Sequence, residues 1–104
     1  MNPWLIVLIA GLMETGWAIG LKYSEGFTRF WPSLATVVGA LGSFWLLSIA
    51  MKTLPVGTAY AVWVGIGAVG TAVLAVALFD EPVSLLRVAG ILLIVAGIAA
   101  LKLA

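Results

Sequence analysis

The sequence predicts an all-α membrane protein, a single four-helix transmembrane domain over residues 1–104. Hydrophobic residues make up 64% of the chain and charged residues only 9%, a balance far from that of a soluble domain. The mean hydropathy of +1.27 agrees with this class. A helix that crosses about 30 Å of hydrocarbon needs about 20 mostly apolar residues. Four such stretches fit into the chain, over about 3–22, 32–51, 57–79 and 84–103.

Three short breaks separate these stretches, at 22–32, 52–55 and 80–82, and each combines polar residues with a proline. Proline interrupts helix interiors, so the breaks are expected at turns. Little chain is left for loops, and we expect no extramembrane domain. The first stretch is expected to be a span rather than a signal peptide, because no basic residue precedes it and an acid interrupts it.

The first stretch contains Glu14, the only charged residue between Trp4 and Leu21. A carboxylate at the centre of a span costs several kcal/mol on insertion scales, so intramembrane acids are rare and usually mark an ion or proton pathway. The chain has no histidine, so Glu14 is the candidate proton carrier. On the same face, small residues such as Gly11 are expected to leave space beside the carboxylate, and Trp17 follows it by about one turn.

In the second stretch Ser43 is a candidate hydrogen-bonding group close to Thr36, Gly39 and Gly42 on the helical surface. Two interpretations are open. Its hydroxyl either bonds a neighbouring helix or bonds the carbonyl four residues earlier in its own helix.

The third stretch places Tyr60 and Trp63 three residues apart, so that a phenol and an indole N–H project from one face. The pair either lines a cation site or, for Tyr60 especially, belongs to the aromatic belt at the membrane surface. Further along, Gly65 and Gly67 serve either close packing or a kink. We favour a hinge.

The fourth stretch has only apolar side chains between Arg87 and Lys102, with Gly90 and Gly97 seven residues apart on one stripe. Small residues at this spacing let two helices approach closely. We therefore expect this helix to form the dimer interface.

The charges at the ends of the spans predict no single orientation. One side of a four-span chain would hold three basic residues (Lys22, Arg29 and Arg87), and the other side would hold two (Lys52 and Lys102). The positive-inside rule needs a clear imbalance. We infer insertion in both orientations and an antiparallel homodimer, which would recreate between two chains the inverted repeat of larger transporters.

Several functions lack the residues that they need. The chain has no cysteine and no histidine, and no metal-ligand cluster, nucleophile–base pair or phosphate loop is recognisable. We expect no enzymatic activity, no cofactor, no metal and no nucleic-acid partner. Membrane lipid, protons and a small cation are the expected partners.

Long strings in the chain match a known family. They are residues 14–24 (ETGWAIGLKYS), 26–29 (GFTR) with 32–33 (PS), and 52–63 (KTLPVGTAYAVW) with 65–70 (GIGAVG). On these strings the whole chain resembles the small multidrug resistance transporters. Trp17 and the string at 52–55 look like the guanidinium exporters of that family, since its exporters of polyaromatic drugs tend to carry a small residue at position 17. Val64 departs from the threonine or serine of many relatives.

The resemblance implies an antiparallel, dual-topology homodimer in the bacterial inner membrane that exchanges protons for a cation. Glu14 would bind both the proton and the cation. Around it, the resemblance places a shell consisting of Gly11, Trp17, Ser43, Tyr60 and Trp63, in which Ser43 and Tyr60 would orient the carboxylate. The expected function is proton-coupled export of guanidinium and small substituted guanidiniums. The alternatives are a broad-specificity proton/quaternary ammonium (multidrug) antiporter and a non-transporting membrane subunit.

Overall fold

The computed structural model describes residues 2–104, and they form four α-helices joined by short loops. The helices are α1 (Pro3–Tyr23), α2 (Phe30–Ala50), α3 (Val56–Phe79) and α4 (Leu85–Leu103). All four are long and apolar enough to cross a membrane, which confirms the all-helical fold class. The largest difference from the expected bounds is at α2, which begins two residues early. Pro32 is accommodated in its first turn, where backbone N–H groups have no helical partner.

The helix ends have local causes. The Asn2 side chain accepts a hydrogen bond from the backbone N–H of Trp4 at 2.8 Å and caps α1, and Ser84 caps α4 by accepting from the N–H of Arg87 at 3.1 Å. Such caps satisfy N–H groups that a helix start leaves free. At the end of α3, Asp80 adopts a left-handed conformation with φ of 54°, which stops the helix.

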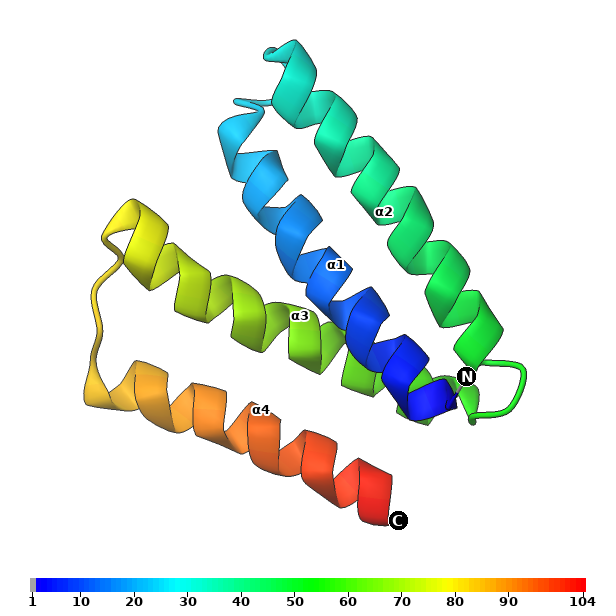
Figure 1. The fold of residues 1–104 in the computed structure, drawn as a ribbon. Coiled ribbons are helices and arrows are strands. Elements are labelled where there is room, and N and C mark those ends of the chain that lie inside the picture. Colours follow the sequence, from blue (N-terminus) through cyan, green and yellow to red (C-terminus); the bar gives the residue numbers. More distant parts are fainter. Residues whose placement is uncertain (1) are drawn as a thin grey trace.

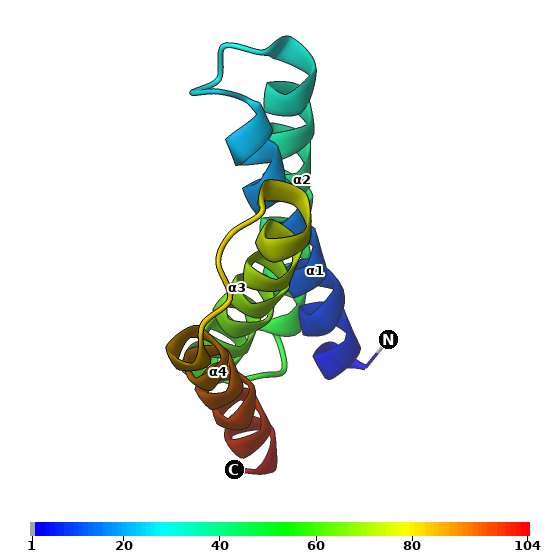
Figure 2. The ribbon, with the colours of Figure 1, turned by 90° about the vertical axis from the view of Figure 1, so that its left-hand side faces the viewer.

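The helices form a thin, open arrangement rather than a closed bundle. α1 and α2 pack as an antiparallel hairpin, α3 crosses α1, and α4 runs back beside α3 (Figure 1). The described chain measures 40 × 34 × 18 Å, and Figure 2 shows the narrow direction. No residue of α4 is buried. A single chain of this shape does not enclose a chamber.

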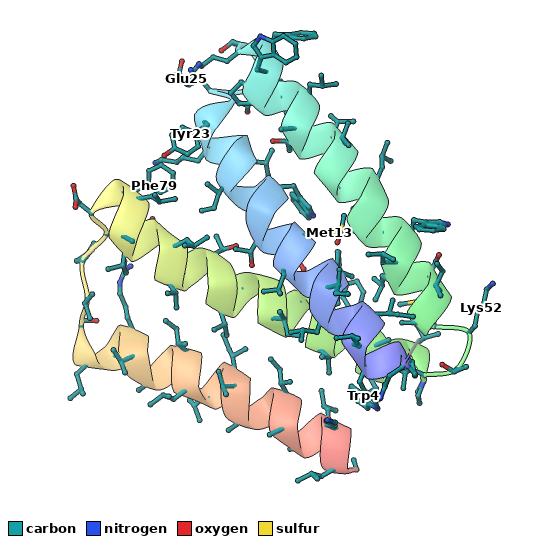
Figure 3. All side chains as sticks on the ribbon, viewed as in Figure 1. Trp4, Met13, Tyr23, Glu25, Lys52 and Phe79 are labelled. Atoms are coloured by element: carbon teal, nitrogen blue, oxygen red, sulfur yellow. The ribbon has the colours of Figure 1, made fainter. Side chains whose placement is uncertain are left out.

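The core lies where the N-terminal half of α1, the C-terminal half of α2 and the N-terminal half of α3 meet. Its buried members are Ile6, Val7, Ala10, Leu47, Ala50, Ala59, Val62 and Trp63. At the other end of α1 and α3, their C-terminal residues Tyr23 and Phe79 are in contact, with ring centroids 5.2 Å apart (Figure 3). Along α1, Glu14 therefore lies between the core residues and the Tyr23–Phe79 contact.

Candidate functional site

The Glu14 carboxyl group lies directly against the backbone of α3 at Gly67. A Cβ atom added to Gly67 would lie less than 3.0 Å from the carboxyl atoms of Glu14. Glycine at position 67 is what makes room for the acid at this helix crossing. Among residues 2–104, nothing hydrogen-bonds the buried Oε2 atom of Glu14. A buried acceptor without a partner is costly, so this oxygen is chemically suited to a proton or a cationic donor.

Thr15, the next residue of α1, contacts α3 at the same crossing. It is 5% exposed, and its hydroxyl lies 3.2 Å from the carbonyl oxygen of Gly67 and 3.4 Å from that of Gly11. A Cβ at Gly70 would collide with the Thr15 hydroxyl. Thr15 was not predicted from the sequence as a site residue. Its position in the sequence, next to Glu14 and four residues after Gly11, could have indicated it.

Ser43 joins three helices. Its hydroxyl donates to the carbonyl of Ala10 on α1 at 2.7 Å and accepts a hydrogen bond from the Trp63 indole Nε1 of α3 at 2.9 Å. The structure thus selects the interhelical interpretation of Ser43 over a bond to its own helix. The group that Ser43 orients is the Trp63 ring, and no hydrogen bond joins Ser43 or Tyr60 to Glu14 within the described residues.

A row of four aromatic rings crosses the helices beside this site. The Trp17 and Phe44 centroids are 6.2 Å apart, Phe44 and Trp63 are 5.7 Å apart, and Trp63 and Tyr60 are 5.7 Å apart. Phe44, which connects the two tryptophans, was not predicted from the sequence as a site residue. Trp17 carries a buried indole N–H that has no acceptor in the described part of the chain. Tyr60, at the end of the row, is 55% exposed.

The predicted small-residue positions fall into different environments. Gly11 faces Ile66 of α3, since a Cβ there would lie 2.7 Å from the Ile66 side chain. Gly65 faces α4, since a Cβ added there would lie 2.9 Å from the Ile98 side chain. α3 continues as one helix through Gly65 and Gly67, so the structure assigns them close packing, and a hinge there stays a prediction.

The stripe of Gly90 and Gly97 on α4 contacts no other helix within the described residues. A Cβ added to Gly90 or Gly97 would meet nothing within 4 Å among the described residues. Their place in a dimer interface is therefore a prediction that this chain alone does not test.

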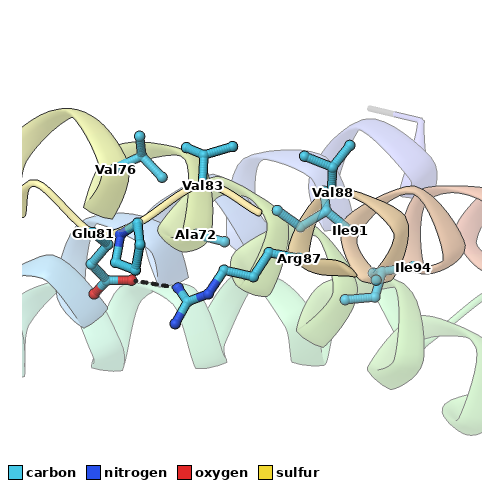
Figure 4. A pocket seen from close by; sticks show the side chains of 10 residues that line it. Ala72, Val76, Glu81, Val83, Arg87, Val88, Ile91 and Ile94 are labelled. Atoms are coloured by element: carbon cyan, nitrogen blue, oxygen red, sulfur yellow. Dashed lines mark ion pairs between the residues drawn. The ribbon is translucent and has the colours of Figure 1, made fainter. Parts of the chain in front are cut away.

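A cleft of about 280 Å³ opens between α3 and α4, away from Glu14 (Figure 4). It is mostly apolar and carries one ion pair, with Arg87 Nη1 3.5 Å from Glu81 Oε1. Among the residues predicted for the site, the hinge or the dimer interface, only Gly90 lines it. We therefore assign the candidate site to Glu14 and the aromatic row rather than to this cleft. Within residues 2–104, no three His, Cys, Asp or Glu side chains gather as a metal site would require.

Comparison with known proteins agrees with the resemblance seen in the sequence. The family model described as Small Multidrug Resistance protein matches residues 2–94. The Guanidinium exporter of Yersinia pseudotuberculosis is 59% identical over 101 residues, which is 97% of each chain. The Guanidinium exporters of Citrobacter freundii and Salmonella typhimurium are each 57% identical over 100 residues, covering 96% of this chain and 95% of theirs.

Proposed function

Since this chain belongs to the small multidrug resistance family, we propose that it is a proton-coupled antiporter that exports guanidinium and small substituted guanidinium cations. Relatives named guanidinium exporters match nearly its whole length at 57–59% identity, which supports a transporter rather than an enzyme. It is a multi-pass protein of the inner membrane, with four membrane-spanning helices. The observation that carries the proposal is the buried Glu14 oxygen without a hydrogen-bond partner among the described residues.

The donors and acceptors of the site suit a guanidinium ion. A guanidinium is planar and permanently charged, and it offers a fork of N–H donors that a carboxylate accepts. Glu14 supplies the acceptor, and the faces of Trp17 and Trp63 add cation–π attraction, which reaches about 2 kcal/mol once water is excluded. Ser43 holds the Trp63 ring at one angle through the 2.9 Å bond from its indole nitrogen. The aromatic row then presents a fixed surface to a flat cation.

Transport is coupled to protons through competition for Glu14. The carboxyl group must lose its proton to bind the cation, and it must release the cation before it can be protonated again. If the site opens to one side of the membrane at a time, this exclusion drives the two fluxes in opposite directions. Two symmetry-related glutamates would permit two protons for each monovalent cation.

We further propose that the functional unit is an antiparallel, dual-topology homodimer. Three features support it: the 18 Å thickness of the chain, the absence of buried residues on α4, and the three-to-two distribution of Lys and Arg over the two sides. In such a dimer, the Gly90 and Gly97 stripes of two α4 helices would meet, and each subunit would contribute its Glu14 to a shared chamber.

Flux through reconstituted liposomes tests the transport activity. Purified protein is expected to move guanidinium against a pH gradient, and Glu14→Gln should abolish this flux because an amide neither carries the proton nor attracts the cation. Glu25→Gln, a loop acid, is the matched control and should keep the activity. Robust transport of tetraethylammonium without guanidinium would replace the proposal with the multidrug antiporter.

Single cysteines test the orientation, because the natural chain contains none. Thr28→Cys lies in the first loop and Thr53→Cys in the second, so the two should face opposite sides of the membrane. With dual insertion, a membrane-impermeant thiol reagent added from one side should label about half of each variant. Complete labelling of one and protection of the other would exclude dual insertion.

A further inference from the structure

Two neighbouring polar side chains of α1, Glu14 and Thr15, both contact the backbone of α3 at the transport site. Gly67 is packed against the Glu14 carboxyl group. The carbonyl of the same Gly67 lies 3.2 Å from the Thr15 hydroxyl, and Gly70, one turn later, leaves the space that this hydroxyl needs. The position of Glu14 relative to α3 is therefore tied to a hydrogen bond made by its sequence neighbour.

The Thr15 hydroxyl has a choice of acceptors. It carries one proton, and the Gly11 carbonyl of its own helix lies 3.4 Å away, only slightly farther than the Gly67 carbonyl. Bonding to the carbonyl four residues earlier is a common alternative for a threonine in a helix. Because of this second acceptor, α1 and α3 can separate without leaving the buried hydroxyl unsatisfied, which would be costly in a membrane.

We propose that Thr15 is a positioning residue of the transport site. Its hydrogen bond to the Gly67 carbonyl keeps Glu14 in one position against Gly67. When α3 moves away from α1, the Thr15 hydroxyl donates to the Gly11 carbonyl instead. The proposal rests on the proposed function, in which a carboxylate in a defined position binds the cation and the site opens to alternate sides.

Guanidinium binding to three variants in detergent or lipid nanodiscs tests the positioning role. Thr15→Val keeps the shape of the side chain but removes the hydroxyl, and it should weaken binding about fivefold, which corresponds to the net value of about one hydrogen bond. Thr15→Ser keeps the hydroxyl and should stay within about twofold of the wild type. The matched control is Thr36→Val, since the buried Thr36 hydroxyl bonds Pro32 within its own helix at 2.8 Å.

Thermal unfolding of the same variants separates positioning from general destabilisation. Thr15→Val should unfold within about 3 °C of Thr36→Val, because an apolar group of the same shape replaces the hydroxyl and leaves no acceptor orphaned. If Thr15→Val does not assemble, Thr15→Ala provides a second variant without the hydroxyl. Wild-type affinity in the hydroxyl-free variant, an equal loss in Thr15→Ser, or an equal loss in Thr36→Val would overturn the proposal.

A distance measurement tests the same bond without relying on any substrate. Spin labels at Leu12→Cys on α1 and Val73→Cys on α3 occupy exposed positions, and dilution with unlabelled chains restricts the signal to one subunit. The distance distribution should broaden toward longer values in Thr15→Val and stay unchanged in Thr15→Ser. An unchanged distribution in Thr15→Val would also overturn the proposal. If the wild-type protein binds no guanidinium, the proposed function fails and this measurement alone decides the role of Thr15.

Discussion

Replacing Ser43 with alanine should destabilise the packing of three helices at once. The change removes the bond to the Ala10 carbonyl at 2.7 Å and the bond from the Trp63 indole at 2.9 Å. Interhelical hydrogen bonds in membrane proteins contribute about 0.6 kcal/mol on average and at most about 1.7 kcal/mol. The indole N–H would in addition lose its acceptor in a buried position. We expect a total loss of about 2 kcal/mol, or about thirtyfold in the unfolding equilibrium.

Unfolding by a denaturing detergent, followed by circular dichroism, measures this loss. The matched control is Ser48→Ala in the same helix, because the exposed Ser48 hydroxyl donates only to Trp45 of α2, at 2.6 Å. The control should lose less than about 0.5 kcal/mol.

A double-mutant cycle identifies the bond responsible. In Trp63→Phe the indole donor is absent, so adding Ser43→Ala should cost about 1 kcal/mol less than it does in the wild type. Equal effects of Ser43→Ala and Ser48→Ala would refute the idea that Ser43 stabilises the packing of three helices. Additive effects of Ser43→Ala and Trp63→Phe would show that the hydrogen bond between these two side chains does not contribute.

Three further outcomes follow from the same geometry. Gly67→Ala places a methyl group on the Glu14 carboxyl and should lower guanidinium flux at least about tenfold. The control Gly57→Ala, where a methyl group has open space, should keep the flux within about twofold of the wild type. Full activity of Gly67→Ala would contradict the close packing of Glu14 against Gly67. Guanidinium affinity, measured by titration calorimetry, should fall about tenfold for each pH unit below the pKa of Glu14 if one carboxyl competes, and up to about a hundredfold if both subunits' carboxyls must be ionised. A pH-independent affinity would exclude competition. Gly97→Leu should block the close approach of two α4 helices and so reduce energy transfer between labelled subunits in vesicles. Ala99→Leu changes the opposite face of α4 and should leave the transfer unchanged. Equal transfer in the two variants would exclude the proposed α4 interface.

The aromatic row and the polar contacts show which contacts the sequence could predict: those within one helix, but not those between helices. Tyr60 and Trp63 were predictable as a pair because residues three apart share a helix face. That Phe44 joins Trp63 to Trp17 was not, because it depends on how α2 is rotated against α1 and α3. The same rotation brings Ser43 to Ala10. In a membrane, lipid-facing and buried positions are both apolar, so hydrophobic periodicity does not reveal which face packs inward.

The sequence by itself determined the class of protein and the approximate spans, and it made Glu14 the first candidate for the site, because the length of an apolar run and a charge within it are local properties. Only the tertiary structure decided what surrounds that charge. Gly67 accommodates the carboxyl group, Thr15 bonds the carbonyl of the same glycine, and Ser43 accepts a hydrogen bond from Trp63. These contacts join residues from different helices, and the crossing of those helices is set by side-chain packing that no single stretch of sequence contains.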